Sequence, residues 1–524
     1  MRIGIDVGGT NTDAVLMDGA LVLAEVKTST TADVTSGIVD AIRALRTRAA
    51  FDPADVQAVM IGTTHFINAI VEADRLAPTA AVRLGLPATR ALPPLVGWPR
   101  QLVGAIRGRA YLCHGGHEYD GREISPLDPA EIRRAAEDIA AKGLRSVAIS
   151  SVYSPVNSEM ELEVARLLSE QLPDAAISMS HEIGRMGLLE RENATIINAC
   201  LRELAGQICD GLGAAVSGAG ITAPLFLSQN DGTLMDVAFA RRYPVATFAS
   251  GPTNSMRGAA FLSGLADCAV VDVGGTTSDI GVLQNGFPRE ATTEVSVNGV
   301  RTNFRMPDVL SLGLGGGSLV REGEDGGLTV GPDSVGYRIR REALVFGGVT
   351  LTATDIAVAA GIAEIGDPGL VAHLDKSLVD GVIEYVNREI AATVDRMRTS
   401  VDPLPVVAVG GGSLLVADTL DGVGQVFRPE HSAVANAIGA AIAQVGGEVD
   451  RMFAVAPGTR DSVLDAAKQE AVDRAVAAGA RPESVQIVEV DEIPVAYLPG
   501  NATRIRVKAV GDLEFETAVS GASR

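Results

Sequence analysis

Residues 3–13 read IGIDVGGTNTD and residues 269–279 read AVVDVGGTTSD, so one short pattern occurs twice, about half the chain apart. In each copy an apolar run leads into Asp-Val-Gly-Gly-Thr, and a second aspartate opens another apolar run that ends at a glycine. This pattern predicts a β-hairpin with a glycine turn. Because internal repetition reflects architecture, the two hairpins predict two similar lobes.

The residue types in these turns are typical of phosphate binding. Paired glycines have no Cβ, so their backbone N–H groups can approach a ligand closely. The threonine adds a hydroxyl donor, and an aspartate at a strand end can hold hydrated Mg²⁺ or orient a nucleophile. We therefore expect the lobes to clamp a nucleotide's phosphates; tight hairpins without a ligand are the alternative. The binding residues expected are Gly8, Gly9, Thr10, Asp13, Gly274, Gly275 and Thr276. The catalytic carboxylates expected are Asp6, Asp272 and Asp279, of which Asp6 and Asp272 are also the expected metal ligands.

A third glycine element follows at residues 405–415, PVVAVGGGSLL. An apolar strand there runs into Gly410, Gly411 and Gly412, a backbone suited to packing against a base or ribose. The sequence contains no Gly-Lys dipeptide, which excludes a Walker A loop. No βαβ unit with a dinucleotide fingerprint is evident either.

These three elements, in this order, resemble those of the acetate/sugar kinase, Hsp70 and actin superfamily of ATPases. The resemblance implies an α/β fold of two duplicated ribonuclease-H-like lobes with ATP and Mg²⁺ in the cleft between them. Other segments are similar to the hydantoinase A/5-oxoprolinase family over about residues 1–450. They include IGTTHFINAIVE at 61–72, FASGPTNSMRGAAFLSGL at 248–265 and VANAIGAAIA at 434–443.

That family couples ATP cleavage to the opening or carboxylation of stable carbonyl compounds. The resemblance therefore implies a component that phosphorylates a hydantoin, 5-oxoproline or another lactam, since O-phosphorylation turns the carbonyl oxygen into a leaving group. The sequence shows no HExxH helix and no Cys–His or Ser–His–Asp signature. We therefore expect a hydrolytic B-type partner subunit and an oligomeric enzyme. A small-molecule kinase and a non-catalytic ATP-gated clamp are the alternatives; a radical-dehydratase activator would need a cluster-binding cysteine pair.

The composition excludes some classes of binding partner and cellular location. The net charge of −21 argues against nucleic acid and anionic membranes. The opening MRIGIDVGG shows no charged-then-apolar leader, which predicts a cytoplasmic protein. The cysteines form no Cys-x-x-Cys pair, so free thiols are expected. His114 and His117 beside Cys113 could form a metal corner, although CHGGHEYDG is more typical of a turn.

The domain boundaries follow from the motif positions. We expect an N-terminal lobe at 1–180, a second lobe with the other phosphate and adenosine motifs at 181–450, and a small C-terminal α/β unit at 451–524. In that unit, residues 461–479 predict an alanine-rich helix, and residues 485–490 and 504–510 predict strands. Residues 188–204 predict a further helix with Glu190 and Glu192 in a solvated first turn.

Overall fold

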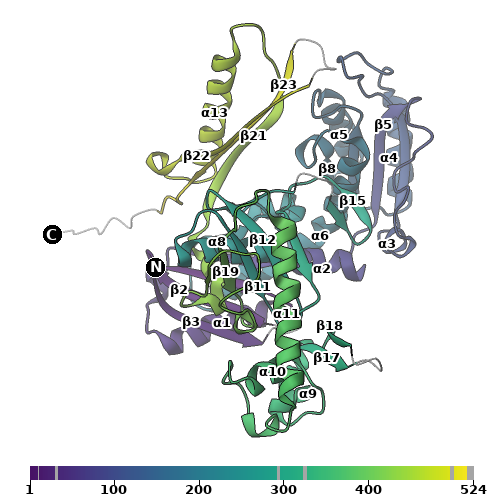
Figure 1. Ribbon diagram of the computed structural model, residues 1–524. Helices are drawn as coiled ribbons and strands as arrows, with labels where there is room; N and C mark the ends of the chain where they lie inside the picture. Colours follow the sequence, from purple (N-terminus) through teal and green to yellow (C-terminus); the bar gives the residue numbers. More distant parts are fainter. Residues whose placement is uncertain (10, 30–33, 292–294, 323–326, 496–500, 516–524) are drawn as a thin grey trace, which may run out of the picture.

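The computed structural model describes the chain except for residues 10, 30–33, 292–294, 323–326, 496–500 and 516–524 (Figure 1). Its first lobe is organised around the first glycine hairpin. Two strands pair antiparallel so that Asp6 lies opposite Asp13, and a later strand adds in parallel on the other side. These strands are β1 (Arg2–Val7), β2 (Asn11–Asp18), β3 (Leu21–Ser29) and β4 (Ala58–Thr63). The predicted hairpin is confirmed.

The second lobe repeats this arrangement. Asp272 lies opposite Asp279 in an antiparallel hairpin, and a later strand pairs in parallel with the first. The strands are β11 (Cys268–Val273), β12 (Ser278–Gln284), β13 (Phe287–Pro288), β16 (Val309–Leu312), β19 (Val406–Val409) and β20 (Val426–Phe427). In the first lobe the strand order is β3-β2-β1-β4-β9, where β9 is Leu225–Ser228. The order β13-β12-β11-β19-β20 in the second lobe matches it, which confirms the expected α/β fold with duplicated lobes.

The C-terminal unit extends the sheet of the first lobe. Its long strand pairs in parallel with β10, so that nine strands form one sheet. The added elements are β9 (Leu225–Ser228), β10 (Thr233–Asp236), β21 (Gln444–Ala454), β22 (Gln486–Pro494), β23 (Ala502–Gly511) and α13 (Arg460–Ala477). The predicted helix and strands of this unit are confirmed. Strand β21 crosses residue 450, and the domain boundaries stay a prediction.

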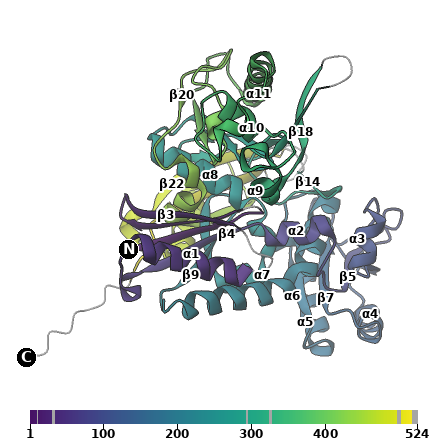
Figure 2. The same cartoon turned by 90° about the horizontal axis from the view of Figure 1, so that it is seen from below.

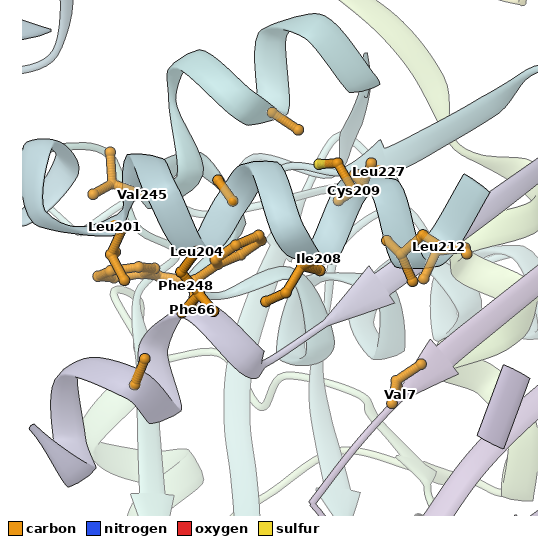
Figure 3. Close-up of a cluster of buried hydrophobic side chains, with 14 of the residues drawn as sticks. Val7, Phe66, Leu201, Leu204, Ile208, Cys209, Leu212, Leu227, Val245 and Phe248 are labelled. Carbon is orange, nitrogen blue, oxygen red and sulfur yellow. The ribbon is translucent and has the colours of Figure 1, made fainter. Parts of the chain in front are cut away.

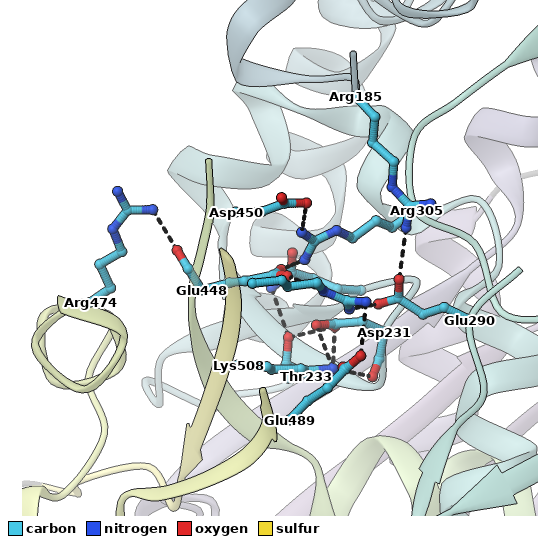
Figure 4. A network of polar contacts seen from close by, with 12 residues as sticks. Arg185, Asp231, Thr233, Glu290, Arg305, Glu448, Asp450, Arg474, Glu489 and Lys508 are labelled. Carbon is cyan, nitrogen blue, oxygen red and sulfur yellow. Dashed lines mark hydrogen bonds and ion pairs between the residues drawn. The ribbon is translucent and has the colours of Figure 1, made fainter. Parts of the chain in front are cut away.

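A network of charged side chains joins this unit to the rest of the molecule (Figure 4). Lys508 of β23 pairs with Asp231 at 2.9 Å, and both side chains are largely buried. Arg305, from the segment before β16, pairs with Asp450 of β21 at 2.7 Å. Breaking one of these poorly hydrated ion pairs would leave an uncompensated buried charge. The pairs therefore fix the position of the C-terminal unit relative to the rest of the molecule.

A separate four-stranded parallel sheet lies to one side of the molecule, away from α10 and α11 (Figures 1 and 2). Its order is β6-β5-β7-β8, and its elements are β5 (Thr79–Leu86), β6 (Arg109–His114), β7 (Ser146–Ser151), β8 (Ala176–Met179), α3 (Arg100–Ala105), α4 (Pro129–Ala141) and α5 (Glu159–Gln171). Helix α6 (Leu188–Gly218) joins this sheet to the first lobe. The expectation of a solvated first turn is wrong for Glu192, which is buried and pairs with Arg83 of β5.

Most of α6 is buried because its apolar residues meet the first lobe on several sides. Leu201, Leu204 and Ile208 pack with Phe66 and Phe248 in the core shown in Figure 3. The surrounding helices are α1 (Val34–Arg48), α2 (His65–Glu72) and α7 (Val237–Arg242). Burying several large apolar side chains together stabilises this junction by roughly 1.5–3 kcal/mol for each of them.

The second lobe has its own core between its sheet and α11. The helices of this part are α9 (Ile339–Glu342), α10 (Ala353–Ala359) and α11 (Lys376–Met397). Helices α8 (Ser250–Ser263) and α12 (Ala435–Ile442) pack on each other; α12 also contacts β1 and β2 of the first lobe, and α8 contacts strands of both lobes. Its short strands are β14 (Val295–Val297), β15 (Val300–Thr302), β17 (Ser318–Glu322) and β18 (Leu328–Ser334).

Helices α8 and α12 pack unusually closely. A Cβ on Gly439 would lie 1.8 Å from the carbonyl oxygen of Asn254, and one on Gly258 would lie 1.9 Å from that of Ala435. Gly4 of β1 makes the same kind of approach to Ala437, at 2.1 Å. Glycine at these positions lets two helices and the central strand touch backbone to backbone, which sets the position of the site described next.

Candidate functional site

The first-lobe carboxylates are held by residues from distant parts of the chain. The side-chain amide of Asn436, on α12, donates to Oδ2 of Asp6 and to Oδ2 of Asp13, at 3.0 Å each. Lys27 of β3 pairs with Asp13 at 2.6 Å. Asp6 is 5% exposed and Asp13 3% exposed. The hydrogen bonds and the Lys27 ammonium group therefore offset part of the free-energy cost of burying these two carboxylates.

The second-lobe hairpin presents its carboxylates in the same way. Ser255 donates a hydrogen bond to Oδ2 of Asp272 at 2.5 Å, and Ser311 donates one to Asp279. Asp272 is partly buried, at the end of β11. The repeat in the sequence is thus also a repeat in the local geometry.

Helix α8 brings the two copies together. Asn254 donates to Oδ1 of Asp6 at 3.4 Å, while its neighbour Ser255 holds Asp272. Two consecutive residues of one helix therefore contact one aspartate from each lobe. The charges of Asp6 and of Lys27 both act on the pKa of Asp272, so the two hairpins face each other at short range.

Burial raises the pKa of Asp6 to about 6, and the neighbouring charge of Asp13 adds to the effect, against the hydrogen bonds from Asn254 and Asn436. Burial likewise raises the pKa of Asp272 to about 6, assisted by Asp279 and opposed by Ser255. Burial also raises the pKa of Asp279. Neighbouring buried carboxylates ionise with difficulty because their negative charges repel. A bound cation favours their ionised form and so stabilises them.

The residues present fit a magnesium ion. Mg²⁺ binds through one or two carboxylates and keeps several waters, so Asp6 and Asp272 suffice as direct ligands. Oδ1 of Asn254 is buried beside Asp6 and has no hydrogen-bond partner among the described residues, which leaves an acceptor for a water bound to the ion. Among the described residues, no three His, Cys, Asp or Glu side chains are grouped to hold a metal ion, so the fit at this site depends on two carboxylates and water. Cys113, His114 and His117, considered as a metal corner, are not grouped in that way either.

The second glycine turn is backed by a loop that sequence reasoning did not assign to the site. The N–H groups of Gly316 and Gly317 donate to the carbonyls of Gly274 and Gly275, at 3.0 and 2.7 Å. A Cβ on Gly315 would lie 2.7 Å from the backbone nitrogen of Thr276. The loop therefore braces the turn, and its run of glycines was the signal in the sequence.

The third glycine element packs against the same carboxylate. Gly410 has a φ of +85°, and a Cβ there would lie 2.2 Å from Oδ1 of Asp272. The N–H of Gly412 donates to the carbonyl of Val273 at 2.8 Å, and a Cβ on Gly411 would lie 3.9 Å from Lys27 of the first lobe. All three glycine elements thus converge on one region between the lobes.

The first turn is more open than the second. A Cβ on Gly9 would meet nothing within 4 Å, whereas Gly8 donates across its turn to the carbonyl of Asn11 at 3.0 Å. Thr10, an expected binding residue, lies outside the described residues. The structure therefore brings together the expected aspartates and the glycines of the second and third elements. Sequence reasoning missed four polar residues, although three of them lie in the segments that resemble the family: Lys27, Asn254, Ser255 and Asn436.

Comparison with known proteins agrees with this architecture. The model of the hydantoinase/oxoprolinase N-terminal region matches residues 2–172, and the hydantoinase/oxoprolinase model matches residues 191–365. The chain belongs to the hydantoinase/oxoprolinase family. The caprolactamase subunit alpha of Pseudomonas jessenii is 29% identical over 479 residues, which cover 84% of this chain and 65% of that subunit. The chain thus spans less than two thirds of the length of this relative.

Two solved structures related to this family share the fold. The ATP-dependent caprolactamase from Pseudomonas jessenii has a TM-score of 0.79 at 20% identity, covering 98% of this chain and 88% of that one. The nucleotide-free acetone carboxylase has a TM-score of 0.70 at 17% identity, covering 99% and 88%. No helix in the described part of the chain is long and apolar enough to cross a membrane.

Proposed function

We propose that this chain is the ATP-dependent component of an enzyme that phosphorylates a lactam or related cyclic amide and so activates it for ring opening. The observation that carries the proposal is the convergence of Asp6 and Asp272, one from each lobe, on adjacent residues of α8. Membership of the hydantoinase/oxoprolinase family and the similarity to a caprolactamase subunit support this substrate class.

Each part of the site has a role in this proposal. Asp6 and Asp272 would hold the magnesium ion, which when bound would neutralise charge on the phosphates. The glycine turns at Gly8 and Gly274 present backbone N–H groups to the phosphates, and Gly410, Gly411 and Gly412 support the nucleoside. Asp279, opposite Asp272, stays an expected catalytic carboxylate, and Asp13, opposite Asp6, an expected nucleotide-binding residue. Lys27 adds a positive charge between the lobes.

The hydrolytic half of the reaction is proposed to lie on a partner subunit. A water that attacks an activated lactam needs a general base or a metal-bound hydroxide. Among the described histidines, His114, His181 and His431 each lie against a single carboxylate, at 2.6–3.1 Å. The caprolactamase relative is itself named as a subunit, which supports a two-component enzyme.

The test has two stages. Binding of a non-hydrolysable ATP analogue with Mg²⁺ is measured by calorimetry, and ATP hydrolysis is then measured with hydantoins, 5-oxoproline and larger lactams. Asp272→Asn should lower turnover by about 10²-fold or more, because it removes a carboxylate that would hold the magnesium ion beside the phosphates. Asp18→Asn, an exposed aspartate at the end of β2, is the matched control and should leave turnover unchanged.

The reaction products distinguish the proposed function from a small-molecule kinase. An ATPase stimulated by a lactam, with ring opening only after a partner subunit is added, supports the proposal. A stable phosphate ester would instead identify a small-molecule kinase. If the folded protein does not bind nucleotide, the proposed nucleotide site is wrong. If the isolated chain opens the ring at about 1 s⁻¹ or faster, the proposal that a partner subunit carries out the hydrolysis is wrong.

A further inference from the structure

A hollow lies at the opposite end of β1 from the paired aspartates. It has a volume of about 540 Å³ and is bounded by the start of β1, the β2–β3 turn, α8, the end of α12 and the C-terminal unit. A strand advances about 3.3 Å per residue, so Arg2 at this end lies roughly 13 Å from Asp6. The residues that carry the argument are Arg2, Arg257, Phe261, Gln444, Arg481 and Asp512.

Arg257 is the unusual member of this lining. Its residue is 9% exposed, and a guanidinium carries five N–H donors. One terminal nitrogen donates to the carbonyl of Gly286 at 2.6 Å, and the other donates to Oε1 of Gln444 at 3.3 Å. The buried Nε has no acceptor among the described residues. The guanidinium also lies 4.0 Å from the centre of the Phe287 ring.

No carboxylate of the described residues forms an ion pair with Arg257. Asp231 is near enough to act on its pKa, but the Asp231 carboxylate is already paired with Lys508 at 2.9 Å (Figure 4). Burial lowers the pKa of Arg257 to about 10, against the opposing effect of the Asp231 charge. A buried cation without a partner carries a desolvation penalty of several kcal/mol.

The rest of the lining also favours an anion. Arg2 and Arg481 face the same hollow, and Asp512 is the only acidic residue among the described residues that line it. Arg481 also pairs, outside this lining, with Glu483 at 3.3 Å. Asp512 accepts from Arg481 at 3.3 Å and from Gln444 at 3.0 Å, so its charge does not reach Arg257 as an ion pair. Phe261 contributes an apolar wall beside these charges. The hollow is within the usual size range of small-molecule sites, about 300–1,000 Å³.

We propose that this hollow binds a small organic anion through a carboxylate or phosphate group, at a site separate from the nucleotide. Arg257 and Arg481 pair with the anionic group, and Phe261 contacts its hydrocarbon part. Because Arg257 lies one turn along α8 from Asn254, an anion there contacts the helix that holds the aspartates of both lobes. The site is therefore placed to couple an anionic metabolite to the nucleotide cleft.

The test measures anion binding directly and does not depend on the proposed ATPase. Adipate and inorganic phosphate are titrated separately by calorimetry into the whole protein at constant ionic strength, with a saturating non-hydrolysable ATP analogue and again without it. One equivalent of at least one anion should bind at about 10 mM or below. Arg257→Gln should weaken that binding at least tenfold, as expected for the loss of a charge-assisted hydrogen bond. Arg340→Gln, an exposed arginine on α9, is the matched control and should bind normally.

Arg481→Gln provides a second, partly exposed variant in case Arg257→Gln does not fold. It too should weaken binding, whereas the melting temperature without ligand should change little. Adipate binding alone assigns the site to carboxylates, and phosphate binding alone assigns it to phosphates. The proposal is overturned if wild-type protein binds neither anion, if the analogue displaces the anion, or if a folded arginine variant binds as tightly as wild type.

Discussion

Replacing Asp6 with asparagine should stabilise the folded protein while abolishing ATP hydrolysis. Burial and the charge of Asp13 raise the pKa of Asp6 from 3.8 to about 6. At pH 8 the ionised group therefore costs the folded state about 3 kcal/mol, at about 1.4 kcal/mol per pKa unit. Asparagine has the same shape without the charge. Its amide oxygen can accept from Asn436, and its amide nitrogen can donate to Oδ1 of Asn254 once the Asn254 side-chain amide turns over, because Nδ2 of Asn254 faces Asp6 in the wild type.

The pH dependence makes this prediction specific. Because the folded-state pKa is raised, the proton-linked stability is fully present below pH 3.8 and is lost as the pH rises through about 6. Wild type thus loses stability over this window, and the variant does not. The stability advantage of Asp6→Asn should fall from about 3 kcal/mol at pH 8 to about 1 kcal/mol at pH 4.5.

The assay is urea unfolding without nucleotide or metal, followed by the fluorescence of the single tryptophan, Trp98, which is buried. Asp421→Asn, an exposed aspartate in a turn, is the control and should show no pH-dependent difference. A variant less stable than wild type at pH 8, or an advantage that is the same at both pH values, would refute the electrostatic reasoning. Retained ATPase activity would refute the catalytic role of Asp6.

Three further predictions follow from the same contacts. Gly439→Ala should lower the free energy of unfolding by about 1–3 kcal/mol and reduce nucleotide affinity, because its Cβ would lie 1.8 Å from the carbonyl of Asn254; urea unfolding and calorimetry measure these effects. Lys508→Met should lower the free energy of unfolding at pH 7 by about 3–5 kcal/mol, since it leaves Asp231 buried without its cation; thermal unfolding measures this loss. Ser255→Ala should move the acidic limb of the ATPase pH profile upward, because Ser255 lowers the pKa of the second-lobe aspartate; initial rates from pH 5 to 8 measure the shift.

Each of these has a control or a contrary outcome. Gly213→Ala changes a glycine of α6 whose Cβ would meet nothing within 4 Å, and it should stabilise by roughly 0.5–1 kcal/mol. Equal effects at Gly213 and Gly439 would contradict the close packing of α8 on α12. For Lys508, the loss should shrink as the pH falls, because Lys508 lowers the pKa of Asp231 and protonation removes the unpaired charge. An unchanged acidic limb in Ser255→Ala would contradict the hydrogen bond to Asp272.

Local patterns in the sequence determined the parts of this protein that depend on near neighbours along the chain. An apolar run, a glycine turn and a second apolar run favour a short hairpin, and the hairpin register then places Asp6 opposite Asp13. The same reasoning predicted α13 and the strands β22 and β23. Repetition of the hairpin predicted the duplicated lobes.

Contacts between distant segments were decided only by the tertiary structure. Asn436 reaches Asp6 and Asp13 across more than 400 residues, and Glu192, expected in solvent, is buried against Arg83 of a neighbouring sheet. Neither follows from local pattern, because helical periodicity says which face of a helix is apolar but not which charged side chain finds a partner. At α8 and α12, glycines decided which polar side chains contact the aspartates. Because these glycines have no Cβ, the two helices approach closely, and their polar side chains then reach the aspartates of both lobes.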